Sequence, residues 1–304
     1  MLNRPGSGGS GRLKGCLTQP VTEKQGSLQQ FHPLVRQWFK ERFGKPTGIQ
    51  EKSWPKIAMG EHVLITAPTG SGKTLTAFLW AIDQLITGRY PTGHTSILYI
   101  SPLKALNNDI QRNLVKPLEE LRRIFDRLKE PFPPTKVLTR SGDTPQTDRR
   151  KMQRYPPEIL ITTPESFNLM LSSMGGRSIL GNVSTVILDE IHSVINSKRG
   201  TYLITAVDRL TALSGEFQRI ALSATVRPLK TVAEFIGGFS VKGDPFDPIY
   251  QPRPVSIFQA ADKKKYALSV QFPEEIAARY DQIGLRKQSM CEPIVRDLKK
   301  IIEK

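Results

Sequence analysis

The sequence predicts an α/β domain built on a largely parallel sheet with helices on both faces. Short apolar runs rich in β-formers alternate with amphipathic helical stretches from Phe31 onward. A glycine-rich turn stands between one such run and a helical stretch, as in phosphate-binding α/β proteins. The length of 304 residues is ample for a buried core. Alternation of strand and helix favours parallel strands joined by right-handed crossovers.

Composition favours a soluble globular protein with a polyanionic partner. Hydrophobic residues make up 38% and charged residues 24%, which is ordinary for globular domains. The formal net charge is +16, from 44 Lys plus Arg against 28 Asp plus Glu. Clustered cations bind phosphate backbones by releasing counterions, so nucleic acid is the expected partner.

Cysteine usage and hydropathy indicate a cytoplasmic protein with no membrane partner. Cys16 and Cys291 are the only cysteines and lie far apart, so no disulfide framework is expected. No apolar run reaches the roughly 18–20 residues that span a bilayer. Residues 1–10 lack the apolar region of a secretory signal.

Residues 1–30 are rich in Gly, Ser and Gln and are interpreted as a disordered tail or linker. Residues 31–240 form the predicted domain. Its expected strands are His62–Thr66, Ser96–Ile100, Thr135–Thr139, Glu158–Thr162, Thr185–Leu188 and Arg219–Leu222. Its clearest expected helices are Leu75–Ile86, Leu103–Leu128 with a kink at Pro117, and Thr201–Leu213.

The alternation of strand and helix patterns ends after Phe239, where proline-rich segments indicate stiff, extended backbone. Residues 241–304 are predicted to form an extended linker with further elements. These are the strands Val255–Gln259 and Tyr266–Phe272 and the helix Glu292–Glu303.

The glycine-rich turn follows the expected strand His62–Thr66 and reads Ala67-Pro-Thr-Gly-Ser-Gly-Lys-Thr74. Its glycines allow backbone N–H groups to surround a phosphate, and the next helix adds its positive end. Lys73 can reach the terminal phosphates of ATP, and the Thr74 hydroxyl can bind Mg²⁺. The residues predicted to bind ATP in this turn are Thr69, Gly70, Ser71, Gly72, Lys73 and Thr74. Ala67 replaces the first glycine of the strict pattern, and a plain glycine-rich turn is the alternative.

A second polar site is expected where the apolar run Val186–Leu188 meets two carboxylates. Asp189 would hold Mg²⁺, and Glu190 would polarise the attacking water as general base. The alternative is a solvated strand end with incidental acids. His192 lies next to this strand, where it could pack or link the strand to another element.

Taken together, these residues resemble superfamily 2 helicases, through a series of motifs in order. The motifs are Gln50 with Phe43 upstream, Ala67–Thr74 (motif I), Ser101–Leu106 (Ia), Thr162–Glu165 (Ib), Asp189–His192 (II) and Ser223–Thr225 (III). The resemblance implies a P-loop NTPase with a RecA-like parallel sheet, in which Gln50 reads adenine. It also implies coupling residues, namely His192, Ser223 and Thr225.

The turns after two expected strands are candidates for nucleic-acid binding, since ligands of α/β proteins bind at the carboxyl edge of the sheet. The candidate residues are Ser101, Pro102, Lys104, Thr163 and Pro164. Their hydroxyl and backbone N–H groups could hold phosphates without reading bases. The alternative is a pair of simple strand-ending turns. The charge run Arg149–Lys151 is interpreted as a solvated helix face.

Further details resemble the large helicase-related (Lhr) family, over about residues 31–275. They are Ser101–Leu106, Ser141–Pro145, Asp189–His192 and Ser197–Gly200. Membership would imply a DNA-stimulated ATPase that moves 3′ to 5′ and unwinds DNA or DNA–RNA duplexes, with suggested roles in DNA repair. Single-stranded DNA or a DNA–RNA duplex is then the expected substrate.

The sequence departs from the family at its end, because nothing in it resembles motifs IV to VI. No Gln-x-x-Gly-Arg-x-x-Arg pattern occurs, so no arginine finger is identified. We therefore expect a fragment, a truncated product or half of a split enzyme, which needs a second RecA-like domain in cis or in trans. Two alternatives to a motor domain are an ATP-binding nucleic-acid module with little turnover, and a P-loop ATPase unrelated to helicases. Gln50 and Ser223–Thr225 argue against a P-loop ATPase unrelated to helicases.

Overall fold

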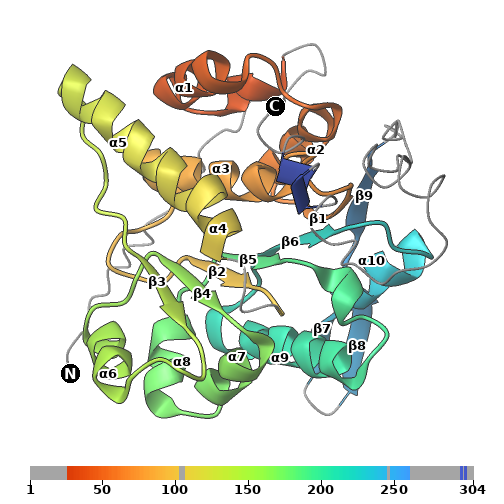
Figure 1. The fold of residues 1–304 in the computed structure, drawn as a ribbon. Helices are drawn as coiled ribbons and strands as arrows, with labels where there is room; N and C mark the ends of the chain where they lie inside the picture. The colour runs from red at the N-terminus through yellow and green to blue at the C-terminus, as the bar shows by residue number, and fades with distance from the viewer. Residues whose placement is uncertain (1–25, 103–106, 245–246, 261–294, 297, 300–304) are drawn as a thin grey trace, which may run out of the picture. The chain divides into compact units, whose positions relative to one another are not determined.

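A computed structural model describes residues 26–102, 107–244, 247–260, 295–296 and 298–299 (Figure 1). The chain divides into a first compact unit that ends at Ala260 and a second unit, Ala261–Lys304. Of the second unit, only four residues of the predicted helix Glu292–Glu303 are described, and they are helical. The predicted strand Tyr266–Phe272 lies outside the described residues.

The first unit alternates strands and helices in chain order. Its strands are β1 (His62–Thr66), β2 (Ile97–Ile100), β3 (Val137–Arg140), β4 (Ile159–Thr162), β5 (Thr185–Leu188), β6 (Gln218–Ser223), β7 (Phe239–Asp244), β8 (Asp247–Pro252) and β9 (Val255–Gln259). Its helices are η1 (Ser27–Gln30), α1 (Pro33–Phe43), α2 (Gly48–Ala58), α3 (Lys73–Ile86), α4 (Asn107–Ile110), η2 (Gln111–Val115), α5 (Lys116–Leu128), α6 (Gln146–Arg154), α7 (Pro164–Leu171), α8 (Met174–Leu180), η3 (Ile191–Ser193), α9 (Lys198–Ser214) and α10 (Leu229–Gly237).

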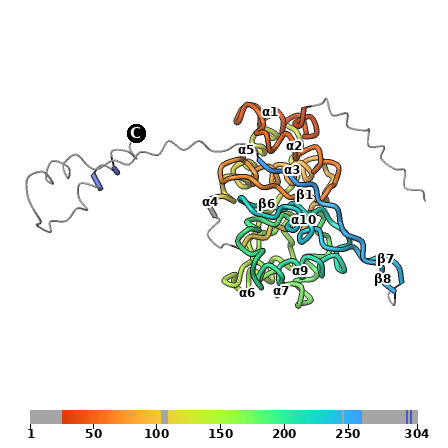
Figure 2. Tube along the Cα trace, turned by 90° about the vertical axis from the view of Figure 1, so that its right-hand side faces the viewer, coloured from red at the N-terminus to blue at the C-terminus, as the bar shows by residue number. Residues whose placement is uncertain are grey.

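The main sheet has seven strands in the order β3-β4-β2-β5-β6-β1-β9. Every neighbouring pair in it is parallel. β7 and β8 form a separate antiparallel hairpin, which projects from the rest of the unit in Figure 2. The sheet confirms the predicted α/β class with a parallel, RecA-like arrangement.

Each central strand sends alternate side chains into two cores, because a strand places successive residues on opposite faces. In β1, Val63 and Ile65 join one core, and Leu64 joins the other. Helices α1, α2, α3 and α5 cover the first face, and α7, α8, α9 and α10 cover the second (Figure 1). Burial on both faces explains why these strands read as continuous apolar runs.

The predicted helix over Leu103–Leu128 is observed in three pieces from residue 107 onward. A π-helical turn, η2, lies immediately before α5, and Pro117 occupies the first turn of α5. The residues before α5 are also helical, so the N–H that Pro117 lacks would have bonded back into η2. The π-helical turn therefore lies where a proline distorts a helix, as the predicted kink at Pro117 requires.

The compact unit extends beyond residues 31–240 at both ends. Ser27–Gln30, which fall in the expected tail, form η1, and Leu28 is only 8% exposed in the core. At the other end, β9 pairs with β1 along its whole length, from His62↔Val255 to Thr66↔Gln259. Without β9, β1 would be an edge strand with unpaired backbone groups. This pairing makes β9 part of the sheet rather than of a linker.

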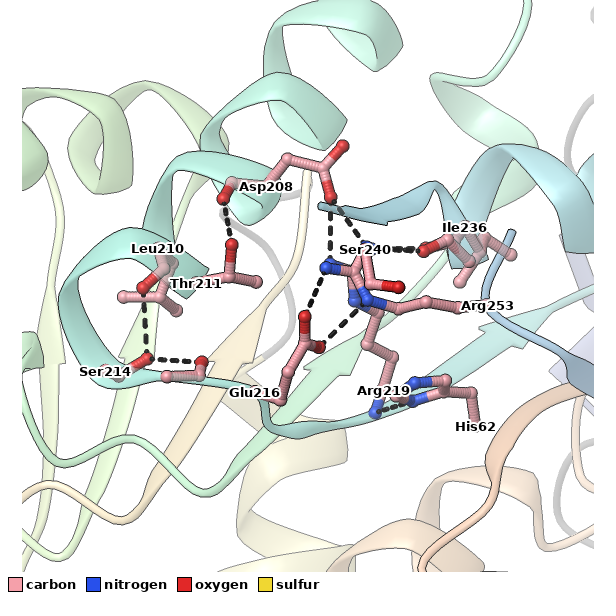
Figure 3. Close-up of polar contacts among 12 residues, drawn as sticks. His62, Asp208, Leu210, Thr211, Ser214, Glu216, Arg219, Ile236, Ser240 and Arg253 are labelled. Carbon is pink, nitrogen blue, oxygen red and sulfur yellow. Dashed lines mark hydrogen bonds and ion pairs between the residues drawn. The ribbon is translucent and has the colours of Figure 1, made fainter. Parts of the chain in front are cut away.

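Two buried arginines anchor the end of α10 beside this sheet edge (Figure 3). Arg219 has no exposed surface, and its Nη1 donates to the carbonyls of Ile236 at 2.8 Å and Gly237 at 2.9 Å. Its Nη2 donates to Asp208 Oδ1 at 2.9 Å. Carbonyls in the last turn of a helix have no partners within the helix, and here a guanidinium supplies them.

Arg253, between β8 and β9, reinforces this anchor (Figure 3). It binds both carboxylate oxygens of Glu216, at 2.9 and 2.7 Å, and donates to the Gly237 carbonyl at 3.1 Å. Nearby, His62 Nδ1 accepts the backbone N–H of Arg219 at 3.1 Å. Burial, followed by the charge of Arg219, lowers the pKa of His62 to about 4, so the ring stays neutral and can accept. The cluster joins β1, β6, α10 and the start of β9.

We predict that Arg219→Ala lowers the free energy of unfolding by about 3 kcal/mol, because the Ile236 carbonyl and Asp208 lose their buried donor. Urea denaturation monitored by circular dichroism would measure it, as a lower midpoint with an unchanged slope. Arg150→Ala, at an exposed position on α6, is the control and should change stability by less than about 0.5 kcal/mol. Equal stability of the two variants would contradict this account.

Candidate nucleotide site and nucleic-acid edge

The phosphate loop connects the end of β1 at Thr66 to the start of α3 at Lys73. Gly70 has φ +80° and Gly72 has φ +86°, both in the left-handed region that glycine tolerates. A Cβ on Gly72 would stand 2.9 Å from Gln50 Nε2. The backbone conformation therefore favours glycine at position 72, as the motif predicts, and a larger residue would also displace the Gln50 amide.

Lys73 and Ala67 tie this loop to the neighbouring strand ends. The Lys73 side chain is 5% exposed, and its Nζ lies 3.9 Å from Glu190 Oε1. The N–H of Ala67 donates to the Ser223 carbonyl at 3.1 Å. Glu190 follows β5, so the Lys73 ammonium beside it lies at the carboxyl edge of the sheet, where ligands of α/β proteins bind.

Gln50 packs against the phosphate loop. It is 2% exposed, its Oε1 accepts the N–H of Thr47 at 2.9 Å, and its Nε2 lies 3.5 Å from the Gly72 carbonyl. Thr47 Oγ1 in turn donates to the Ser71 carbonyl at 3.2 Å. The start of α2 therefore braces the loop directly. Phe43, which lies upstream of Gln50 in the same motif, is 45% exposed.

Asp189 follows β5 and is 2% exposed. Its Oδ2 accepts from the Tyr99 hydroxyl on β2, and its Oδ1 accepts the N–H of Glu190 at 2.8 Å. Burial raises the pKa of Asp189, and the hydrogen bond from Tyr99 opposes this rise. The two hydrogen bonds fix the orientation of the carboxylate at the strand end.

Glu190 adopts the left-handed conformation, with φ 50° and ψ 39°. Non-glycine residues rarely adopt it, and such backbone strain is common at functional sites. The turn places the Glu190 carboxylate between Lys73 and His192, with His192 Nε2 at 3.2 Å from Oε2. His192 Nδ1 accepts the N–H of Ala224 at 3.2 Å. His192 therefore bridges the ends of β5 and β6.

The residues after β6 complete this edge. Ser223 is buried, and among the described residues its Oγ has no hydrogen-bond partner. Thr225 is exposed. Of the three predicted coupling residues, only His192 is seen to join two strand ends. Its partner is the backbone N–H of Ala224, which lies between Ser223 and Thr225.

The candidate nucleic-acid residues follow neighbouring strands. Ser101 and Pro102 follow β2, and the Ser101 N–H donates to the Thr162 carbonyl of β4 at 3.1 Å. Thr163 caps α7, because its Oγ1 accepts the N–H of Ser166 at 3.4 Å, and Pro164 begins that helix. The turns are therefore adjacent, and Thr163 has a structural role as well. Lys104 lies outside the described residues.

Arg140 and Arg149 lie at this edge of the sheet, and neither was predicted to belong to it. Arg140 ends β3 and is 7% exposed, and its Nη1 has no hydrogen-bond partner in the described part of the chain. Arg149 donates to the carbonyls of Thr144 and Gly142, each at 2.8 Å. The predicted solvated face is confirmed for Arg150 and Lys151, which are exposed, but Arg149 is partly buried and donates to the turn after β3. For Arg140, its position at a strand end before the turn Ser141–Thr144 is the pattern that could have identified it.

The residues present fit a magnesium-bound nucleoside triphosphate. Ser71 Oγ is buried in the phosphate loop with no partner among the residues described. The buried Lys73, the glycines and the oriented Asp189 supply cation, N–H donors and carboxylate, which are the groups that hold a triphosphate and its metal. Fold and site together define a P-loop, RecA-like nucleotide-binding domain.

Comparison with known proteins identifies the family. Residues 47–235 match the DEAD/DEAH box helicase family. The match covers more than half of the 304-residue chain, and the chain belongs to this family.

Curated relatives narrow the similarity. The chain is 45% identical over 256 residues to the Lhr helicase/probable uracil glycosylase of Mycolicibacterium smegmatis, covering 84% of this chain and 16% of that protein. It is 49% identical over 216 residues to the Lhr helicase/uracil glycosylase of Escherichia coli, covering 68% of this chain and 14% of that protein. The chain therefore spans a small part of the length of these relatives.

A solved structure of Mycobacterium smegmatis helicase Lhr, bound to single-stranded DNA and AMP-PNP, shares the fold. It aligns with a TM-score of 0.74 and 41% identity, over 92% of this chain and 33% of that one. None of the helices in the described residues has the length and apolar character needed to cross a membrane.

We predict that Lys73→Ala weakens ATP binding by about 10- to 100-fold, because a charge-assisted contact to the phosphates contributes about 1.5–3 kcal/mol. Isothermal titration calorimetry would measure the affinity, and circular dichroism should report a retained fold. Lys56→Ala, on the exposed surface of α2, is the matched control. Equal affinities of wild type and Lys73→Ala would refute the assignment.

Proposed function

We propose that this chain is the ATP-hydrolysing motor domain of a 3′ to 5′ nucleic-acid helicase that acts on DNA. The observation that carries the proposal is the contact series Lys73–Glu190–His192–Ala224, which joins the phosphate loop to the ends of β5 and β6. Such a series can convert a change at the phosphate into movement of neighbouring strand ends. The polarity and the DNA substrate are inferred from the resemblance to the Lhr family.

In this proposal the chain's own groups perform separate tasks at the nucleotide. The N–H groups of the phosphate loop and Lys73 bind the phosphates. Gln50 recognises adenine after its side-chain amide turns away from the Gly72 carbonyl of the loop. Glu190 accepts a proton from the attacking water. Thr74 and Asp189 would hold Mg²⁺, which neutralises charge on the phosphates when bound. His192, Ser223 and Thr225 transmit the state of the site to the rest of the edge.

The nucleic acid is proposed to cross the ends of β2, β4 and β3. Ser101, Pro102, Lys104, Thr163 and Pro164 would contact phosphates through hydroxyl, ammonium and backbone groups, and Arg140 would add a guanidinium. Single-stranded DNA is the preferred ligand, since the similar Lhr structure contains it. A DNA–RNA duplex is the further substrate that the resemblance implies.

A second RecA-like domain, in cis or in trans, is proposed to complete the catalytic site. An arginine finger can accelerate phosphoryl transfer by about 10³–10⁵, and the sequence contains no motif that would supply one. The second candidate function is an ATP-dependent nucleic-acid-binding module with little turnover. The widely spaced Cys16 and Cys291 support a reducing, cytoplasmic setting.

We predict that Glu190→Gln separates nucleotide binding from hydrolysis in a version completed by a second RecA-like domain. The amide keeps the shape of the side chain but cannot take a proton, so turnover should fall by about 100-fold or more. ATP affinity should remain close to that of the wild type. Phosphate-release kinetics and calorimetry would measure both, with Glu51→Gln on α2 as control. Unchanged turnover would exclude Glu190 as the base.

We predict weak, salt-dependent binding of single-stranded DNA with little sequence preference. Fluorescence anisotropy across a salt series should give a negative slope of log affinity against log salt, of about 0.7 per phosphate contacted. Arg140→Ala should reduce the magnitude of this slope by about 0.7 if it contacts one phosphate. Strong preference for one oligonucleotide, or affinity that ignores salt, would contradict the proposed interface.

A further inference from the structure

The segment Ser197–Gly200 begins α9 and follows the Asp189–Glu190 pair along the chain. A Cβ on Gly200 would lie 2.4 Å from the Val194 carbonyl, so only glycine permits this close approach of the helix start. The close approach sets where the first turn of α9 lies. Arg199, the residue before Gly200, is thereby held at the carboxyl edge of the sheet.

Arg199 contacts the turns after two other strands. Its Nε donates to Glu165 Oε1 at 2.6 Å, and its Nη2 donates to Glu165 Oε2 at 3.2 Å. The same Nη2 donates to the Pro102 carbonyl at 2.9 Å. Glu165 lies in the first turn of α7, immediately after Thr163 and Pro164. One guanidinium therefore joins the turn after β2, the turn after β4 and the start of α9.

A second contact supports the same alignment of helices. Asn168 Nδ2 donates to the Tyr202 carbonyl at 3.3 Å, one turn further along both α7 and α9. The hydrogen bonds from Arg199 lower the pKa of Glu165, so the carboxylate stays charged at neutral pH. The forked geometry restricts both partners more than a single ammonium contact could.

The exposure of the pair argues for a role in alignment rather than in stability. The side chains of Arg199 and Glu165 are 39% and 54% exposed, and ion pairs this exposed contribute little to folding because water screens them. The three hydrogen bonds direct the guanidinium toward protein acceptors. Through these contacts one guanidinium connects the Pro102 carbonyl to Glu165 in the first turn of α7.

We propose that Arg199 is a positioning residue that holds the turns after β2 and β4 in one arrangement competent to bind nucleic acid. Arg199 lies on the segment after β5 that also carries Asp189 and Glu190. The positions of the two turns are therefore fixed relative to the end of β5. This inference rests on the proposed function, because it assumes that nucleic acid crosses these turns.

The test uses the 304-residue chain and fluorescently labelled single-stranded DNA in a salt series. Arg199→Ala should lower affinity by about tenfold at fixed salt, while the salt slope stays unchanged, because no phosphate contact is removed. A direct phosphate ligand would instead reduce the magnitude of the slope by about 0.7. Arg199→Lys keeps the charge without the fork and should recover part of the affinity.

Glu165→Ala supplies the sharper variant. Removing a carboxylate near the DNA would strengthen binding by charge alone, whereas loss of positioning weakens it. We expect weaker binding, and a double variant with Arg199→Ala that is no weaker than the single variants, as for two members of one contact. Arg209→Ala, exposed on the same helix, is the control and should bind as the wild type does.

The outcomes separate this inference from the proposed function. If the wild type does not bind single-stranded DNA, the proposed function fails. Two results would overturn positioning by Arg199 while the proposed function stands. One is that Arg199→Ala binds as well as the wild type; the other is that its salt slope falls in magnitude by about 0.7, the value for one phosphate contact. If Arg199→Ala does not fold, Glu165→Ala decides: weaker binding supports positioning, and equal or stronger binding overturns it.

Discussion

The parallel register of β1, β6 and β5 is the constraint on which the rest of the structure depends. Thr66 pairs with Ser223, and Leu188 pairs with Ala221, so the three strands end at nearly the same height. Parallel strands have a single polarity, and all their carboxyl ends must meet at one edge. Because of this alignment, the side chains that follow the three strands come within a few ångströms of one another.

The segment that follows β5 links the two halves of that edge. Near its start, Glu190 and His192 contact the phosphate loop and the end of β6. Further on, Arg199 contacts the turns after β2 and β4. One continuous stretch of chain therefore touches both the proposed nucleotide site and the proposed nucleic-acid edge. A displacement of this stretch cannot leave either unaffected.

The features predictable from sequence were those encoded locally. The strands over His62–Thr66 and Thr185–Leu188 were predicted with their observed bounds, because burial on both faces leaves an unbroken apolar run. The glycines of the phosphate loop follow from backbone conformation alone. Contacts between segments far apart in the sequence were not predictable. The hydrogen bond from Arg199 to the Pro102 carbonyl is an example, because it depends on where α9 lies relative to the turn after β2. Likewise, the predicted strand Val255–Gln259 was correct, but its place beside β1 needed knowledge of the whole sheet.

The position of β9 has a mechanical consequence. β9 runs parallel to β1 over its whole length, and the N–H of Ala260 donates to the Thr66 carbonyl at 2.9 Å, at the last residue before the phosphate loop. Tension applied to the chain beyond Ala260 along the strand would load this ladder of hydrogen bonds in shear. All bonds would then resist together, instead of opening one after another as they do when a strand is peeled away. The same tension would be delivered to β1, the strand that leads into the phosphate loop.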